Sequence, residues 1–392
     1  MNLKDIIHKV SHQGEQKWDI LKTNLKTRLG LDEPVMILPY RSFGNTQKAF
    51  FWGRVLEDEK INVKEDDKFW DNILNTYRRL ESDEIPNVRL SVTYKGITKE
   101  TKTDEEGYFF TEIELSEPIT PHESMWEKVE FKLLENVRPN QGDVTALGEV
   151  QIHDDLKEFG IISDIDDTVL QTQATSMLAS AKLTFLGNAH LRKPFLGVGE
   201  LYEALVKGSD GNQQNPLYFV SSSMWNLYDL LTDFFEIRNL PKAPLLLRDL
   251  GLDDKMFFKG DHSHKEEKIK RIFSYYPNLK FILIGDSGQH DAEIYYKMLQ
   301  EFPERIKAIY IRDVSDNARD AEVDKIATQA EKEFNVPFQL IADSGLVALH
   351  AASQGFITKE SIEKVQQAKE EDKKAPLTLE EAVVKGEIEV KN

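Results

Sequence analysis

Cysteine is absent from the 392 residues of the sequence. This absence excludes disulfide bridges, a thiolate nucleophile and a zinc site with cysteine ligands. Long apolar runs are also missing, so neither a signal peptide nor a membrane-spanning helix is predicted. Together these absences predict a soluble, cytoplasmic protein, and they leave peripheral contact with a membrane open.

The chain has fewer basic than acidic residues. The chain has 50 lysines and arginines against 68 aspartates and glutamates, which gives a formal net charge of −18 at pH 7. Surfaces that bind nucleic acid need a basic patch, so nucleic acid is excluded as a partner. The same charge repels anionic membranes on average. Hydrophobic residues make up 40% of the chain, which is enough for a core, and the length suits two or three domains.

The chain is predicted to begin with a helical segment, residues 1–33. Leu3, Ile6 and Val10 follow helical spacing within it. The apolar face is narrow and lysines are interspersed with acids. This pattern favours packing on another domain over lying on a membrane.

Residues 34–155 contain the alternation of apolar and polar residues that is typical of strands, most clearly from Val88 to Tyr94. Turn sequences separate several such segments, which favours a small β-sandwich. A helix from Phe69 to Leu80 is predicted to interrupt the strands. Because no catalytic grouping of residues occurs here, we expect an accessory domain that positions or recruits. The sequence does not identify its protein partner.

Residues 156–357 alternate between short apolar segments and amphipathic ones. This pattern predicts a doubly wound α/β domain built on a parallel sheet. Beyond its first apolar segment, its strands are predicted at 217–220, 281–284, 306–311 and 338–341. The interval 173–216 is longer than a simple crossover, so we expect it to hold a small insertion over the strand ends. Residues 358–392 are charge-rich and are predicted to form a helical tail.

Three carboxylates, those of Asp164, Asp166 and Asp167, follow the first apolar segment of this domain. Open α/β sheets bind ligands at the carboxyl ends of their strands. In an extended chain Asp164 and Asp166 lie on the same side, where they repel each other unless a cation or a proton intervenes. One carboxylate can attack a phosphorus atom while the other carries a proton. The alternative is an acidic turn that caps a helix beginning near Asp167 or Thr168.

Polar side chains also follow two later strands. Ser221 ends one, and Asp286 and Asp291 follow the other. Because the carboxyl ends of parallel strands share one edge, we expect these groups to converge with Asp164 and Asp166. Such oxygen ligands suit Mg²⁺, and the serine hydroxyl can donate to a phosphoryl oxygen. Taken alone, Ser221 would be a helix cap and Asp286 a turn residue.

A phosphoryl group also needs a cation to offset its charge. Lys265 opens the helix before the third of these strands and is the candidate, with Lys259 and Lys268 as competitors. Three histidines lie near the same strand ends and offer a transition-metal site as the lesser alternative. They are His262, His264 and His290.

Four motifs in order carry these residues: Asp164-x-Asp166-x-Thr168, Ser221 after a strand, Lys265, and Gly-Asp286 with Asp291. They resemble the motifs of haloacid-dehalogenase-type phosphatases. More narrowly, the chain resembles the actin-patch phosphatidate phosphatase family and its bacterial homologues. The strings that carry this are Ser-Asp-Ile-Asp-Asp-Thr-Val, Phe-Val-Ser-Ser-Ser-Met-Trp-Asn-Leu-Tyr, His-Lys-Glu-Glu-Lys-Ile and Ile-Leu-Ile-Gly-Asp-Ser-Gly-Gln-His-Asp. The resemblance covers most of 160–355, and Gly53-Arg54-Val55-Leu56 is similar to that family's β-rich N-terminal domain.

This resemblance implies a role for each matching residue. Asp164 would be the nucleophile and Asp166 the general acid and base. Ser221, Lys265 and Thr168 would hold the phosphoryl group. The implied Mg²⁺ ligands are the carboxylates of Asp164 and Asp286, with support from Asp291, and the backbone carbonyl of Asp166.

With these roles the chain is predicted to be a Mg²⁺-dependent phosphatase that forms an aspartyl-phosphate. The resemblance implies phosphatidate as the substrate, with diacylglycerol as the product. Met224 stands where the family usually has proline, so the substrate pocket stays undetermined. Two alternatives are kept: a phosphatase of a soluble phosphomonoester, and a non-catalytic interaction module with a vestigial phosphatase site.

Overall fold

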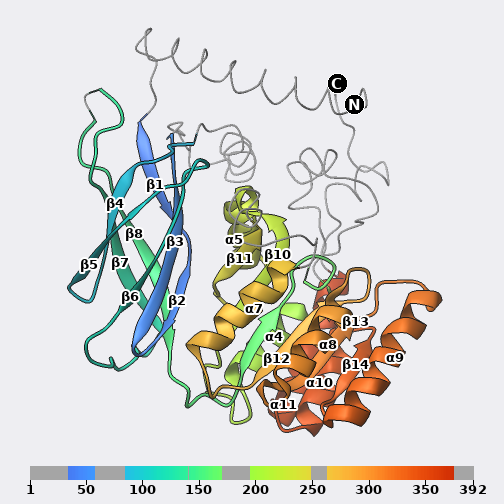
Figure 1. The fold of residues 1–392 in the computed structure, drawn as a ribbon. Helices are drawn as coiled ribbons and strands as arrows, with labels where there is room; N and C mark the ends of the chain where they lie inside the picture. The colour runs from blue at the N-terminus through green and yellow to red at the C-terminus, as the bar shows by residue number, and fades with distance from the viewer. Residues whose placement is uncertain (1–33, 58–83, 140, 170–194, 249–262, 375–392) are drawn as a thin grey trace, which may run out of the picture.

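The computed structural model describes residues 34–57, 84–139, 141–169, 195–248 and 263–374. Within these ranges the chain forms a largely antiparallel sheet followed by a parallel one (Figure 1). The expected order, a β-rich domain before a parallel α/β domain, is confirmed. The predicted segment 1–33, the predicted helix from Phe69 to Leu80 and the first half of the predicted insertion 173–216, residues 173–194, lie outside the described residues. The second half of that interval contains the helix α4 (Val198–Lys207).

The β domain, residues 34–153 as described, is one sheet that curls around its own core. Its strand order is β1-β3-β2-β8-β7-β4-β5, with β6 paired to β3 on the other side. The paired strands are antiparallel except for β2 and β8, which are parallel. The curl brings β5 beside β6, where the Thr101 hydroxyl donates to the Phe110 carbonyl at 2.9 Å. The strands are β1 (Val35–Pro39), β2 (Ser42–Asn45), β3 (Lys48–Glu57), β4 (Arg89–Tyr94), β5 (Ile97–Lys102), β6 (Tyr108–Glu114), β7 (Trp126–Leu133) and β8 (Thr145–His153).

Alternation of side chains explains why these residues form a half-buried sheet. In β7 the side chains of Val129, Phe131 and Leu133 point into the core, and Glu130 between them is exposed. Successive side chains of a strand point to opposite faces, so this pattern buries one face and hydrates the other.

The parallel sheet has the order β11-β10-β9-β12-β13-β14, and every pairing in it is parallel. From β9 the chain builds outward to β10 and β11 on one side, and it then returns to build β12, β13 and β14 on the other. The switch point therefore lies between β9 and β12, where sheets of this kind bind ligands. All residues of β9 and β12 are buried, because helices cover both faces. The strands are β9 (Gly160–Ser163), β10 (Leu217–Met224), β11 (Leu245–Arg248), β12 (Phe281–Asp286), β13 (Ile306–Arg312) and β14 (Phe338–Ile341).

The helices of this domain fall into two packed groups, one of α7, α8 and α9 and one of α4, α10 and α11. In the charge-rich tail, α11 packs on the domain through Val365, which is fully buried, and Asp372 accepts a hydrogen bond from the Gly197 amide at 2.7 Å. The helices are α4 (Val198–Lys207), η1 (Trp225–Leu227), α5 (Tyr228–Ile237), α7 (Ser263–Tyr275), α8 (Asp291–Glu301), η2 (Pro303–Arg305), α9 (Asn317–Phe334), α10 (Ser344–Ser353) and α11 (Lys359–Lys374). None of the described helices is both long and apolar enough to cross a bilayer.

Aromatic side chains join the two domains into one shared core. Phe43 of β2 lies edge-on to Tyr218 and Tyr275, with ring centroids 5.4 and 5.0 Å apart. The Tyr276 hydroxyl donates to the Gly44 carbonyl at 2.7 Å. Because these buried contacts cross the boundary, the β domain packs directly on β10 and α7 of the α/β domain.

Three strands were not predicted from the sequence: β2, β5 and β11. β2 and β11 have only four residues each, too few to establish a period. β5 consists largely of exposed threonine, lysine and glutamate, so it has no apolar alternation. Its place in the sheet depends on pairing with β4, which the local sequence does not reveal.

Candidate active site

The three predicted strand ends meet at one edge of the parallel sheet. Asp164 directly follows β9, Asp286 is the last residue of β12, and Ser221 lies in the final part of β10. In register, Ser163 of β9 pairs with Ile284 on one side and with Phe219 on the other. The side chains that follow these positions therefore gather beside the switch point, as the sequence predicted.

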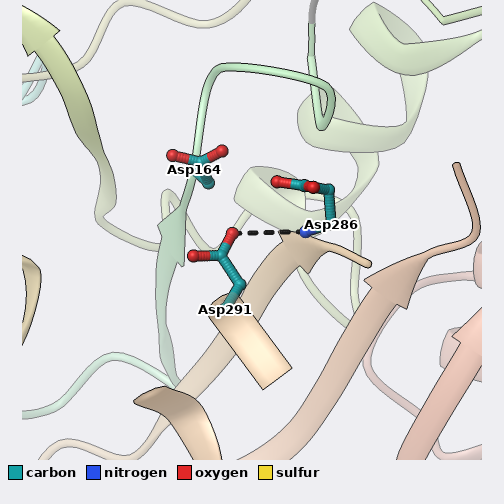
Figure 2. A group of neighbouring side chains, drawn as sticks. All are labelled: Asp164, Asp286 and Asp291. Carbon is teal, nitrogen blue, oxygen red and sulfur yellow. Dashed lines mark hydrogen bonds between the residues drawn. The ribbon is translucent and has the colours of Figure 1, made fainter. Parts of the chain in front are cut away.

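Asp164, Asp286 and Asp291 form a buried group of carboxylates. Each offers an oxygen within 4.8 Å of the others, and all three side chains are fully buried (Figure 2). The Asp286 amide donates to Asp291 Oδ2 at 3.2 Å, which fixes the start of α8 against the end of β12. Gly285 allows this approach, because a Cβ there would lie 2.5 Å from Asp291 Oδ2. We call this group the three-carboxylate cluster.

Burial makes the negative charge of the cluster costly. It raises the pKa of Asp164 well above the usual range, and the Lys265 ammonium only partly opposes this. Burial and the neighbouring Asp291 charge raise the pKa of Asp286 to about 8. Asp164 Oδ2 and Asp286 Oδ2 accept no hydrogen bond from the described residues. Bare carboxylate oxygens with excess negative charge fit a hard divalent cation such as Mg²⁺, and no histidine belongs to this group.

Lys265 supplies the positive charge of the site. It lies in the first turn of α7, is 2% exposed, and places Nζ 2.9 Å from Asp164 Oδ1 while also pairing with Asp291. Burial lowers the pKa of this lysine, but the two carboxylates more than offset that effect and raise it. Of the two competitors, Lys259 lies outside the described residues, and Lys268 is partly buried further along α7.

Asp166 points to the serine run 221–223 in the last part of β10 and lies outside the three-carboxylate cluster. Its Oδ2 accepts hydrogen bonds from the hydroxyls of Ser221 at 2.9 Å and Ser223 at 2.8 Å. The Ser223 amide in turn donates to Ser221 Oγ at 2.8 Å. Ser223 was not singled out from the sequence, although the run of three serines after an apolar strand is a usable signal. Asp166 is therefore held beside Ser221 and Ser223 by its side chain.

Thr168 and Arg312 close the other side of the loop that follows β9. The Thr168 side chain is buried and its Oγ1 has no hydrogen-bond partner among the described residues, while its carbonyl accepts from Arg312 Nε at 3.1 Å. Arg312 also donates to Ser344 Oγ at 3.2 Å, and its Cζ lies 3.8 Å from the ring centroid of Phe195. Sequence reasoning missed this arginine, which ends the apolar strand β13 and could have been found by that position.

Residues 159–313, which contain the whole cluster, match the family model described as "Phosphatidate phosphatase APP1, catalytic domain". This segment is an APP1-family catalytic domain. Over 163 residues the chain is 32% identical to phosphatidate phosphatase APP1 of Saccharomyces cerevisiae, a match that covers 41% of this chain and 27% of that protein. It is 28% identical over 259 residues to an uncharacterized protein of Schizosaccharomyces pombe, covering 64% and 42% respectively. The matches thus span less than half the length of these relatives.

Among solved structures, a carbohydrate acetylesterase from Xanthomonas citri matches with a TM-score of 0.24 and 13% identity, over 75% of this chain and 73% of that one. A β-glucuronidase of Bifidobacterium dentium matches with a TM-score of 0.22 and 9% identity, over 79% and 60%. TM-scores and identities this low support no conclusion about the fold or function of this chain.

The β domain touches the APP1-type site through η1 and the start of α5, which directly follow the serine run of β10. Tyr40 stacks on Trp225, with ring centroids 4.4 Å apart and planes 11° from parallel. Trp52 lies edge-on to the same indole at 6.3 Å, and the Arg41 amide donates to the Tyr228 hydroxyl at 2.7 Å. Trp225 follows Ser223 by two residues, so these contacts fix the end of β10, whose serine hydroxyls bind Asp166.

Replacing Tyr40 with leucine is therefore expected to lower the turnover number several-fold as well as the stability. An aromatic pair contributes about 0.5–1.5 kcal/mol beyond its buried area. The control is Phe131→Leu, which removes a ring from a pair inside the β-domain core, 5.6 Å from Phe109. It should lower stability without changing turnover. Thermal unfolding and initial rates measure both effects, and equal turnover in the two variants would contradict the role of the stack.

Proposed function

We propose that this chain is a Mg²⁺-dependent phosphatase that works through an aspartyl-phosphate on Asp164. One observation carries the proposal: three fully buried carboxylates within 4.8 Å, with an ammonium 2.9 Å from Asp164, in an APP1-family catalytic domain. Unpaired buried charge is expensive to maintain, and its concentration at a ligand-binding edge favours chemistry over a vestigial site.

In the proposed reaction an Asp164 oxygen attacks the phosphorus atom and the bond from phosphorus to the leaving oxygen breaks. Asp166 gives its proton to that leaving oxygen. It then takes a proton from a water molecule, whose oxygen attacks phosphorus and frees phosphate from Asp164. Ser221 and Lys265 hold the phosphoryl oxygens. Asp164 and Asp286, with Asp291 and the Asp166 carbonyl in support, would hold a Mg²⁺ ion, which would supply neutralising charge.

Phosphatidate, with diacylglycerol as the product, is the proposed substrate, and the APP1-family match supports it. Action on phosphatidate requires peripheral contact with a lipid surface. A soluble phosphomonoester is the second candidate, favoured by the net charge of −18, which opposes docking on anionic lipid. Both candidates use the same phosphoryl chemistry and differ only in what surrounds the leaving oxygen.

Phosphate release tests the proposal directly. The purified chain is incubated with phosphatidate in phosphatidylcholine vesicles and, in parallel, with a panel of soluble phosphomonoesters, each with Mg²⁺ or with EDTA. We expect release from the vesicles with Mg²⁺ and loss of release with EDTA. Release from the panel alone would replace the lipid by a soluble substrate. No release from either source with Mg²⁺ would overturn the assignment as a phosphatase.

A further inference from the structure

The loop between β12 and α8, residues 287–290, joins two carboxylates of the three-carboxylate cluster. Asp286 ends β12 before it and Asp291 begins α8 after it. The chemistry proposed above requires both carboxylates to keep their places beside Asp164. Side chains at the ends of a loop are placed less precisely than those within a strand or helix, unless surrounding groups hold them. The groups that hold this loop therefore decide the geometry of the cluster.

One side chain from another helix holds this loop at two points. Arg319, in the first turn of α9, donates from Nε to the Ser287 carbonyl at 3.0 Å and from Nη2 to the Gln289 carbonyl at 2.9 Å. The same guanidinium forms a two-pronged pair with Glu293 in the first turn of α8, at 2.5 and 2.7 Å. The planar fork of arginine suits several simultaneous bonds, so this one residue joins α9, the loop and α8.

Arg319 is itself placed by the end of its own helix. Asp316 caps α9 and accepts hydrogen bonds from the Ala318 and Arg319 amides at 3.1 and 3.0 Å. The Arg319 side chain is 20% exposed, so water competes for its donors only in part. A capped helix end gives the guanidinium a fixed starting point, which is what a group that supports a site needs.

The hydrogen bond from Arg319 to Gln289 reaches the cluster through a single residue. The Gln289 amide donates to Asp286 Oδ1 at 2.8 Å, so the loop engages this oxygen. The other oxygen, Oδ2, accepts no hydrogen bond from the described residues. The Asp286 carboxylate points toward Asp164, which leaves Oδ2 available to an ion that both share (Figure 2). Partners that orient a ligating carboxylate in this way tune its affinity for a metal.

We propose that Arg319 is a positioning residue for the Mg²⁺ site. By holding residues 287–290 against α9 it orients the Asp286 carboxylate toward the ion. The inference rests on the proposed function and extends the site to a helix that contributes no residue to the cluster. A purely electrostatic effect would have the opposite sign, because removal of a positive charge from this region would favour a cation. The direction of the change in Mg²⁺ affinity therefore separates the two effects.

The test measures Mg²⁺ binding by the purified full chain without substrate, by titration calorimetry at constant pH and ionic strength. Arg319→Gln should raise the dissociation constant about tenfold or more, the usual result of losing a group that orients a metal ligand. Arg319→Lys keeps the charge and loses the planar fork, so it should raise the constant by a smaller factor. The Mg²⁺ concentration that half-saturates phosphate release should rise in parallel, while turnover at saturating Mg²⁺ should change less.

Arg305→Gln is the matched control. Arg305 precedes β13, at the end of the sheet opposite the cluster, and its guanidinium also donates to backbone carbonyls. These are the carbonyls of Phe273, Tyr276 and Leu279. Loss of these bonds should lower the melting temperature in EDTA and leave the Mg²⁺ dissociation constant within twofold. The same melting curves show that each variant is folded.

An unchanged or lower dissociation constant for Mg²⁺ in the folded Arg319 variants would overturn the inference and leave the phosphatase proposal standing. Equal weakening in Arg305→Gln would also overturn it, since a general loss of stability would then explain the result. No Mg²⁺ binding by the wild-type chain would overturn the inference. If the wild-type chain also released no phosphate from any ester, the proposed function would be overturned with it.

Discussion

Replacing Asp164 with asparagine is expected to reduce phosphate release by at least about 10³-fold, the scale at which removal of a nucleophile acts. The amide is nearly isosteric but does not attack phosphorus. The substitution also removes one of the three charges that the cluster buries. Initial rates of phosphate release with Mg²⁺ measure the loss of activity, on whichever ester the wild-type chain hydrolyses fastest.

The fold should survive this change. Burial raises the pKa of the Asp164 carboxyl, so its charge destabilises the folded state, and an uncharged amide removes that penalty. We expect the melting temperature in EDTA to be unchanged or higher. The control is Asp143→Asn, since the Asp143 side chain is 81% exposed and pairs only with a surface lysine. Near wild-type turnover by a folded Asp164→Asn variant would contradict the covalent mechanism.

The strand ends of the parallel sheet could be predicted because they rest on local patterns. Short apolar runs that end in Asp164, Ser221 or Asp286 mark buried strands whose polar ends share one edge. The expectation that carboxylates distant in sequence would gather is met by the cluster, in which Asp164 and Asp286 lie close enough to share an ion. The role of each residue stays a prediction until rates are measured.

What the sequence did not reveal depends on contacts between distant segments. Nothing local says that Tyr40 stacks on Trp225, 185 positions further along the chain, since either ring reads as an ordinary core residue. The same holds for Arg312. It donates hydrogen bonds to the Thr168 carbonyl and to Ser344, and only folding brings these distant groups next to it. The strand β5 pairs with β4 although its residues do not alternate between apolar and polar, so the surrounding fold decides this pairing.

The site concentrates charge that the fold alone does not need. Asp164, Asp286 and Asp291 are fully buried, one ammonium opposes them, and two of their oxygens lack donors among the described residues. Replacing such a cluster by apolar groups would stabilise many proteins. Retaining such a cluster lowers the stability of the folded protein, and a trade of stability for binding is common at sites where local rules are broken.

Replacing Lys265 with methionine should test this trade most directly. The variant leaves the buried carboxylates without their cation, and breaking a buried ion pair costs about 3–5 kcal/mol of unfolding free energy. Phosphate release should also fall, by about 10²-fold or more, because the phosphoryl charge loses its partner. Lys270→Met is the matched control on the same helix, where Lys270 pairs with Glu301 at a partly exposed position.

The loss of stability should depend on pH in a defined direction. The folded protein holds the Asp286 proton up to a pKa of about 8, against an ordinary value of 3.8, so it binds more protons than the unfolded chain between these limits. The contribution of this group to the unfolding free energy therefore falls as pH rises from about 4 to 8. Without Lys265 the cluster has no opposing charge, and the variant should lose more stability at pH 8.5 than at pH 5.

Denaturant unfolding in EDTA at the two pH values measures the effect, with Lys270→Met as the baseline. Mg²⁺ should restore part of the lost stability to Lys265→Met at pH 8.5, because the ion replaces the missing positive charge and binds the folded state alone. It should have a smaller effect at pH 5, where protons compete for the same oxygens. Equal unfolding free energies for the two variants at both pH values would show that Lys265 does not hold the cluster together.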